Sequence, residues 1–219
     1  MMLKLLSNLL DEPDLTSALN NPEQAGLPSA MADGLAGLLL NEPTQNSLQL
    51  IPTLFRNIPE ELQRDMPDPD AEPPELQVLR DDYLDLFLSS SSGRYKAPYG
   101  AVWLEGRFNG TTTSQVGEIY TQAGFDPSLV SVSEHWLNPF MPDHIGFELA
   151  FLAGLLYSAR EKGETDPDEA RELVATAYGF AEQPMSLWAG SFGRNVREAA
   201  HTSVYQDLGG LLMILFPEG

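Results

Sequence analysis

The sequence predicts an all-α protein. Apolar residues recur at three- and four-residue steps in nearly every segment, which is the spacing of one face of a helix. β-branched residues are few and seldom alternate with polar ones, so signals for strands are poor. The 219 residues, 42% of them hydrophobic, are enough for one domain with a sizeable core. We therefore expect a single globular helical domain over residues 1–219, with roughly eight to ten helices.

The first helix is expected at the N-terminus, in MMLKLLSNLLDEPD. This stretch has one Lys and a short apolar run followed by acids, and it lacks a small-residue cleavage site. It is therefore interpreted as an amphipathic helix and not as a signal peptide.

The segment ELQVLRDDYLDLFL (75–88) predicts a second amphipathic helix. Its apolar stripe consists of Leu76, Leu79, Tyr83, Leu86 and Phe87. Its charged residues, expected mostly on the other side of the helix, are Arg80, Asp81, Asp82 and Asp85.

Two strongly apolar segments predict helices of the core, 145–157 and 197–216. In the first, IGFELAFLAGLLY, the residues at helical spacing are Ile145, Leu149, Leu152 and Leu156. In the second, REAAHTSVYQDLGGLLMILF, they are Val204, Leu208, Leu211, Leu212 and Leu215.

Local signals indicate where some helices begin and end. Asp166 is a suitable N-cap, Pro167 suits a first helical position and Glu169 stands three residues after the cap. Thr111–Ser114 is expected to open a helix that ends at Gly124, because glycine readily adopts the left-handed conformation of a helix end.

The segment MPDHIGFELAFLAGLL (141–156) places an Asp-His pair directly before an apolar run. Proline is tolerated in a first helical turn, and a carboxylate there interacts favourably with the positive end of the helix. Pro142-Asp143 is therefore predicted to start the helix, with Asp143 as its cap.

Loops are expected where Pro, Gly, Ser and acidic residues gather. The predicted loops are 20–28, 65–74, 89–98, 124–142 and 161–166. The segment 124–142 is also predicted to be a seam that divides the domain into two lobes.

The charge balance limits the classes of partner. There are 32 acids against 12 bases, which gives a net charge of −20. Such a field repels phosphate backbones and anionic membrane surfaces, so nucleic-acid binding is not expected. It favours a cationic partner such as a basic peptide, although acidity also serves solubility or adaptation to salt.

The chain has no Cys, which excludes disulfides, thiolate nucleophiles and cysteine-ligated metal sites. Its longest apolar runs, at 145–157 and at the C-terminus, are shorter than the roughly 20 residues that a membrane-spanning helix needs. We expect a cytoplasmic protein with no stable membrane insertion.

One pattern is compatible with a metal-dependent enzyme. His144 and Glu148 are four residues apart, so both side chains share a helix face and are able to ligate one ion. The chain has only two other histidines, His135 and His201, and no HExxH or repeated ExxH pattern. It also lacks a GxSxG elbow and a P-loop. A solvent-facing or capped Glu148 is the simpler interpretation.

Aromatic residues surround the Ser-rich loop. Tyr83 and Phe87 lie on a helical stripe and are expected mainly in the core. Tyr95 lies within the loop, and Tyr99 and Trp103 follow it. Tyr99 and Trp103 offer the amphipathic contact area that is enriched at interfaces. An aromatic groove in an acidic protein suits a peptide with both Arg and apolar residues.

Three ordered stretches resemble the TorD/DmsD/NarJ family of cytoplasmic chaperones for molybdenum-containing redox enzymes. The first is YLDLF (83–87) followed by APYGAVWLE (97–105). The second is MPDHIGFELAFLA (141–153), and the third is the C-terminal part 180–216. The resemblance covers residue 83 to the end, whereas the first 70 residues share only helical character with the family.

The resemblance implies the all-α fold of this family and the function of a chaperone without catalytic turnover or cofactor. The implied partner is the precursor of a molybdopterin-containing enzyme, whose twin-arginine signal peptide is bound until the cofactor is inserted. Family positions implicated in this binding correspond to Asp143, His144, Pro98 and Tyr99, and a family glycine corresponds to Gly110. Some family members form domain-swapped dimers and some bind GTP, so a monomer or a swapped dimer is expected.

The chain departs from the family pattern at three places, one of which is Phe140-Met141, where some members have Glu-Pro before the Asp-His pair. Ala101 stands where the family has Ser, and Pro184 stands where it has His. The peptide-binding hypothesis therefore uses Asp143 and His144 as the exposed end of a core helix, with Tyr83, Phe87 and Trp103 as aromatic neighbours. The alternative is a metal-dependent enzyme that uses His144 and Glu148, and the place of Glu148 in either site stays open.

Overall fold

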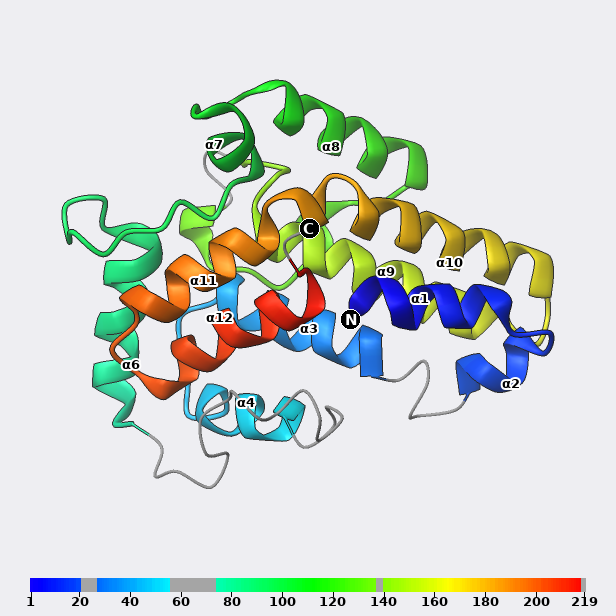
Figure 1. The fold of residues 1–219 in the computed structure, drawn as a ribbon, viewed down its shortest axis with the longest axis horizontal. Coiled ribbons are helices and arrows are strands. Elements are labelled where there is room, and N and C mark those ends of the chain that lie inside the picture. Colours follow the sequence, from blue (N-terminus) through cyan, green and yellow to red (C-terminus); the bar gives the residue numbers. More distant parts are fainter. Residues whose placement is uncertain (21–26, 56–73, 137–139, 218–219) are drawn as a thin grey trace.

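The computed structural model describes residues 1–20, 27–55, 74–136 and 140–217 (Figure 1). Eleven α-helices and no strand are present in these residues, which confirms the all-α prediction. The helices are α1 (Met2–Asp11), α2 (Leu15–Asn20), α3 (Leu27–Leu40), α4 (Ser47–Phe55), α6 (Leu76–Tyr83), α7 (Gly100–Glu105), α8 (Thr111–Ala123), α9 (Ile145–Lys162), α10 (Pro167–Glu182), α11 (Ala189–Ala199) and α12 (Ser203–Leu215).

Helix α9 is the centre of the fold. It packs against α3 on one side and α10 on another, and α1 lies along α10. Helices α11 and α12 form a tightly packed pair, and the short α7 and α8 lie together at one edge of the molecule (Figure 1). Within the described residues, no helix is long and apolar enough to cross a membrane.

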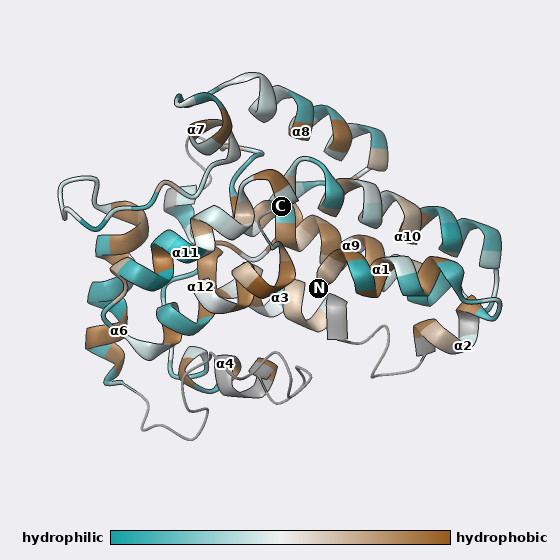
Figure 2. Ribbon diagram, in the orientation of Figure 1, coloured by the Kyte–Doolittle hydropathy of each residue, from teal (hydrophilic) through white to brown (hydrophobic). Residues whose placement is uncertain are grey.

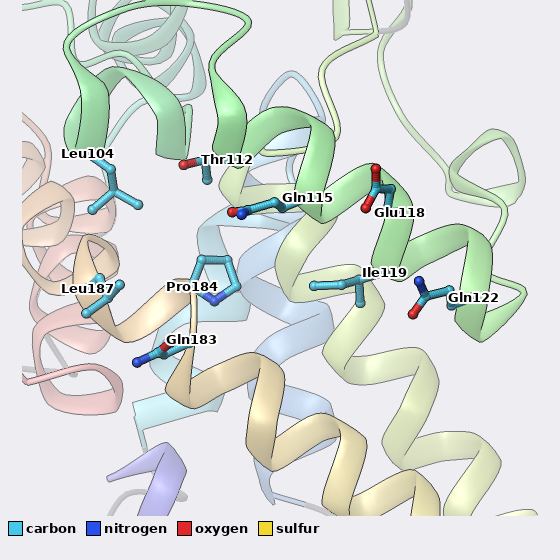
Figure 3. A pocket seen from close by; sticks show the side chains of 9 residues that line it. All are labelled: Leu104, Thr112, Gln115, Glu118, Ile119, Gln122, Gln183, Pro184 and Leu187. Carbon is cyan, nitrogen blue, oxygen red and sulfur yellow. The ribbon is translucent and has the colours of Figure 1, made fainter.

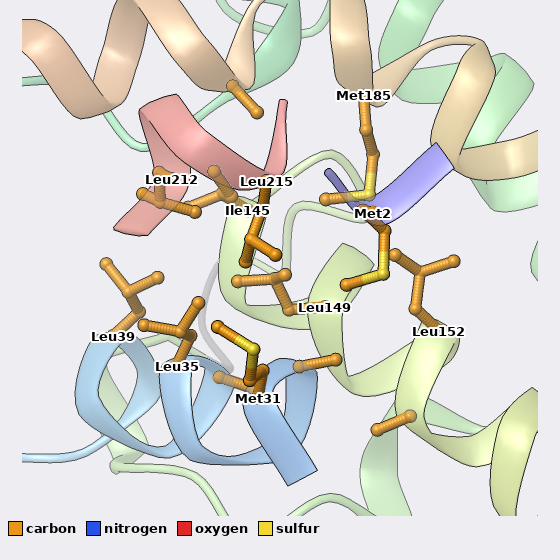
Figure 4. Packing of buried hydrophobic residues seen from close by; sticks show 14 of the residues in the cluster. Met2, Met31, Leu35, Leu39, Ile145, Leu149, Leu152, Met185, Leu212 and Leu215 are labelled. Atoms are coloured by element: carbon orange, nitrogen blue, oxygen red, sulfur yellow. The ribbon is translucent and has the colours of Figure 1, made fainter. Parts of the chain in front are cut away.

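The buried apolar side chains form one cluster that runs from the first helix to the last. Figure 4 shows part of this cluster, to which Met2, Leu35, Leu149 and Leu212 contribute from α1, α3, α9 and α12. The ribbon coloured by hydropathy shows the apolar colour concentrated on these inner helices (Figure 2). The cluster takes side chains from both sides of the predicted seam at 124–142, and the division into two lobes stays a prediction.

Local signals identified several helix ends correctly. The Asp166 carboxylate accepts a hydrogen bond of 3.0 Å from the amide of Glu169, as an N-cap does. Helix α8 ends at Gly124, whose φ of 70° is the left-handed conformation expected there. Residues 89–98 form a loop as predicted. Most of the predicted loops 65–74 and 20–28 lies outside the described residues.

The predicted C-terminal helix is interrupted. Helix α11 ends at Ala199 and α12 begins at Ser203, so 197–216 is not one helix. The prediction was wrong because the linking amides of His201 and Thr202 donate to the Asp82 carboxylate at 3.0 and 2.8 Å. A distant acceptor thus satisfies the backbone groups that a continuous helix would have paired internally.

The same interaction corrects the expectation for Asp82. Its side chain is buried and lies under the link between α11 and α12, although the sequence placed it among the charged residues of the outer face. Helix α6 continues at Leu84–Leu88 as a π-helical segment, which changes the rotation of the residues that follow.

Candidate functional site

Two of the sequence motifs are joined by backbone hydrogen bonds. The amide of Ile145 donates to the Pro98 carbonyl at 2.9 Å, and the amide of Gly100 donates to the Asp143 carbonyl at 2.8 Å. These bonds place Tyr99 opposite His144 as an isolated antiparallel bridge. The motifs 97–105 and 141–153 therefore form one structural unit, which we call the motif junction.

Asp143 caps α7 and not α9. Its Oδ2 accepts a hydrogen bond of 2.8 Å from the amide of Ala101, in the first turn of α7. The N-cap of α9 is His144, whose Nδ1 accepts a hydrogen bond of 3.0 Å from the Gly146 amide. The prediction that Asp143 caps the following helix was wrong, because its side chain turns back toward the earlier segment with which its backbone pairs.

The Asp-His pair is buried. Asp143 has no exposed surface and His144 is 1% exposed, so the expectation of an exposed end of the helix was wrong. Both residues are covered because the 97–101 segment lies across them and aromatic rings close over the imidazole. Any part that they take in binding must therefore be the positioning of other groups.

Aromatic side chains enclose the imidazole of His144. Its ring centroid lies 4.4 Å from that of Trp136 and 5.4 Å from that of Tyr99. Trp136 in turn donates its indole N–H to the Tyr83 hydroxyl at 2.8 Å, and Tyr83 donates to the Leu39 carbonyl at 3.2 Å. The motif junction is thereby connected to the core through a buried chain of hydrogen bonds and ring contacts.

Tyr83 and Phe87 lie in the core, where their helical spacing placed them. Tyr83 is 0% exposed and Phe87 is 1% exposed, and their rings are 5.6 Å apart. Burial, aided by Glu42 and Tyr99, raises the pKa of Tyr83 far above its ordinary value, although the hydrogen bond with Trp136 opposes the shift. Neither side chain reaches the surface, so both support the site from beneath.

Tyr99 and Trp103 are the half-buried aromatics of the junction. The Trp103 indole N–H donates to the Ala97 carbonyl at 2.7 Å, which ties α7 to the segment before it. The Tyr99 ring contacts Phe108 edge to face at 5.4 Å, and Phe108 is 56% exposed. These rings form the outer surface of the motif junction, whereas Pro98 is buried beneath it.

Gly110 is required by a carboxylate that the sequence did not single out. The Glu105 carboxylate accepts from the amides of Thr111 and Thr112 at 3.0 and 2.7 Å, so it caps α8 from the preceding helix. A Cβ on Gly110 would overlap this carboxylate. The amide hydrogen bonds lower the pKa of Glu105 to about 2. Local cap rules miss Glu105 because it stands six residues before the helix it caps.

Two carboxyl groups are buried beside each other under the junction. Burial raises the pKa of Asp143, and burial together with the Asp143 charge raises the pKa of Glu148 well above its ordinary value. The Trp188 indole N–H faces the Glu148 carboxyl, without reaching ideal hydrogen-bond geometry, and opposes its shift. Glu148 is 0% exposed, so the solvent-facing interpretation of this residue was wrong.

The structure does not favour the alternative of a metal-dependent enzyme that uses His144 and Glu148. Among the described residues, no group of three His, Asp or Glu side chains is arranged to hold an ion. The Nδ1 atom of His144 is already the acceptor that caps α9. His144 and Glu148 remain a pair of neighbours on one side of the helix start.

Comparisons with known proteins identify the family. The family model described as nitrate reductase delta subunit matches residues 48–194, which is more than half of the chain. The chain belongs to this family of NarJ/TorD-type chaperones, as its motifs predicted. It is also similar to the crystal structure of a protein assigned to redox enzyme maturation from Archaeoglobus fulgidus, at 20% identity and a TM-score of 0.36, over 70% of this chain and 94% of that chain. No curated protein matches it significantly.

Proposed function

We propose that this protein is a cytoplasmic chaperone that matures a molybdenum-containing redox enzyme. It binds the twin-arginine leader on the precursor of that enzyme and holds it until the cofactor is inserted. It acts by binding, without catalytic turnover. The observation that carries the proposal is the direct pairing of the 97–105 and 141–153 motifs in a chain of this family.

The electrostatics favour a cationic leader. The net charge of −20 attracts a segment that carries two arginines and repels nucleic acids and anionic surfaces. Carboxylates are suited to guanidinium groups because two parallel hydrogen bonds form between them. A cationic peptide is therefore expected to associate with this acidic protein faster than a neutral peptide does.

The buried position of Asp143 and His144 defines their part in this function. Asp143 fixes the start of α7, and His144 fixes the start of α9 and supports the Tyr99 ring. At the motif junction itself, the half-buried Tyr99 and Trp103 are available to contact a leader. In this arrangement the Asp-His pair positions the binding surface, and Tyr99 and Trp103 are the part of that surface that lies at the motif junction.

Isothermal titration calorimetry of the full chain tests the proposal. The titrant is a synthetic peptide with two adjacent arginines followed by an apolar segment of about a dozen residues, the usual length of such a segment. A peptide with lysines in place of the arginines is the control. Binding of the arginine peptide, weakened in the lysine peptide, supports the proposal; equal heats of dilution for both peptides would reject it.

A pair of aspartate variants separates binding from folding. Asp143→Asn keeps an acceptor oxygen, but a neutral amide accepts the Ala101 hydrogen bond more weakly than a carboxylate does, so the start of α7 is held less firmly and peptide affinity is expected to fall more than stability. Asp166→Asn makes the same change at the cap of α10 and is expected to leave affinity unchanged. Equal affinities for the two variants would show that Asp143 does not position the binding surface.

A further inference from the structure

A groove with a volume of about 530 Å³ lies between α8 and the turn that joins α10 to α11. Figure 3 shows side chains from α7 and α8 facing those of the turn across it. The lining residues are Leu104, Thr112, Gln115, Glu118, Ile119, Gln122, Gln183, Pro184 and Leu187.

The lining combines exposed apolar surface with side-chain amides. Leu104 is 39% exposed and Leu187 is 58% exposed, and both point into the space between the helices (Figure 3). Large apolar side chains gathered at one concave place indicate a binding surface more strongly than scattered ones do. The three Gln side chains, one of them Gln183, can donate to and accept from the backbone of a bound segment.

The groove is continuous with the motif junction. Leu104 lies on α7, whose first turn is held by Asp143, and Thr112 lies at the start of α8, which Glu105 caps. On the opposite wall, Leu187 directly precedes Trp188, and the indole nitrogen of Trp188 lies within 3.1 Å of the place where a Cβ on Gly100 would be. Both walls are thus fixed by groups of the motif junction.

The charges at the groove favour one kind of occupant. Glu118 is the single charged residue among the nine described residues that line the groove, and it lies on α8 one turn from Gln115 and Gln122. The rest of the lining is uncharged in a protein whose net charge is −20. An apolar segment with a cationic group beside it matches this pattern, because burying more charge on the neutral lining would be costly.

We propose that this groove binds the apolar segment of the leader, with the adjacent arginine pair directed toward Glu118. The proposal rests on the proposed function, since it specifies where the same peptide lies. Leu104, Ile119 and Leu187 then contact the apolar segment, and the glutamines pair with its backbone. The motif junction acts on binding through the walls that it positions.

The test uses three variants and two peptides in fluorescence anisotropy titrations. Leu187→Glu and Glu118→Gln alter the groove, and Leu129→Glu is the matched control, because Leu129 is an 84% exposed leucine that does not line the groove. The peptides are the arginine and lysine forms described above. Leu187 is so exposed that its substitution is expected to leave folding intact, which the thermal melting curve checks.

We expect a different change in peptide affinity for each of the three variants. Leu187→Glu should weaken binding of the arginine peptide by about tenfold or more, since an apolar contact is replaced by a charge. Leu129→Glu should leave it within about twofold, as expected of a surface substitution. Glu118→Gln should reduce the preference for the arginine peptide over the lysine peptide.

The failure of this inference differs from the failure of the proposed function. If the wild type binds the arginine peptide and Leu187→Glu binds it equally well, the groove assignment is overturned and the chaperone function stands. If Glu118→Gln keeps the full arginine preference, the orientation is overturned. If the wild type binds neither peptide, the proposed function itself fails.

Discussion

The side chain of Asp143 accepts a hydrogen bond of 2.8 Å from the backbone amide of Ala101, 42 positions away in the sequence. This bond makes the Asp-His motif part of the start of α7, because Asp143 supplies the N-terminal acceptor that α7 lacks in its own sequence. The adjacent backbone bond from Gly100 to the Asp143 carbonyl fixes the same contact from the main chain. The short helix α7 therefore depends on a residue outside it.

Removing this acceptor should destabilise the fold. Asp143→Ala leaves the Ala101 amide buried without its partner, and we expect the free energy of unfolding to fall by about 1–3 kcal/mol. Asp143→Asn retains an oxygen at the same place and should cost less. Urea denaturation followed by far-UV circular dichroism measures both, and equal stabilities for wild type and Asp143→Ala would contradict the capping role.

The buried Glu148 should make stability depend on pH. A carboxyl whose pKa is raised by folding binds its proton more tightly in the folded state than in the unfolded chain. The free energy of unfolding therefore decreases as pH rises from the ordinary Glu value of 4.5 through the raised folded pKa. The Glu148→Gln variant has no titrating carboxyl at this position, so its free energy of unfolding should decrease less over the same pH range.

Urea midpoints at intervals between pH 4.5 and pH 8 check this expectation. The comparison is between the slopes of the two proteins, because Asp143 and Asp207 also have raised pKa values and contribute in the same direction to both. The pKa of Asp207 is raised to about 7 by burial, with Arg197 opposing the shift. Parallel curves for the wild type and Glu148→Gln would show that the Glu148 carboxyl is not the source.

Local sequence signals predicted those features whose partners are close in the chain. Asp166 caps a helix that begins at the next residue, and Gly124 ends a helix at its own position. The apolar spacing of α9 also predicted its burial, because a helix that is apolar on most sides belongs in the core. These features depend on a few neighbouring residues, so one sequence is enough to infer them.

The errors share a different cause. The partner of Asp143 is 42 positions away, and the Thr202 partner of Asp82 is 120 positions away. The sequence placed Asp82 on the charged face of its helix and Asp143 at an exposed helix start, since an acidic residue is rarely buried unless it is paired. The groove was missed for the same reason, because Leu104 and Leu187 come together only through the packing of distant helices.

Asp82 is expected to be a major determinant of stability. Its carboxylate accepts from the Arg94 guanidinium and, at 2.7 Å, from the Thr202 hydroxyl, in addition to the two linking amides. Asp82→Ala removes one partner of a largely buried charged network, and the expected loss is about 3–5 kcal/mol. Thermal and urea unfolding should both register it.

The neighbouring Asp81 provides the control for this change. Its side chain is exposed, and its carboxylate accepts from the Gln77 amide at 2.9 Å. Asp81→Ala should change stability by about 0.5 kcal/mol or less, as surface substitutions usually do. Similar losses for Asp81→Ala and Asp82→Ala would mean that general acidity, and not the link to Thr202, accounts for the effect.

A glycine-to-alanine substitution is expected to change stability in opposite directions at two positions, one at the crossing of α11 and α12 and one on the exposed side of α10. A Cβ on Gly193 would lie 2.7 Å from the Gly209 carbonyl oxygen and 2.7 Å from the Leu212 Cβ, so the two helices would have to separate. Gly193→Ala should therefore destabilise the protein by about 1–3 kcal/mol or more. Gly179 lies on the exposed side of α10, and no atom of the described part of the chain lies within 4 Å of the place where its Cβ would be. Gly179→Ala should stabilise by about 0.5–1 kcal/mol, because alanine loses less conformational freedom in a helix than glycine does. Urea denaturation measures both variants under one condition. A Gly193→Ala variant as stable as the wild type would contradict the close approach of α11 and α12, and a destabilised Gly179→Ala would contradict the open position of Gly179.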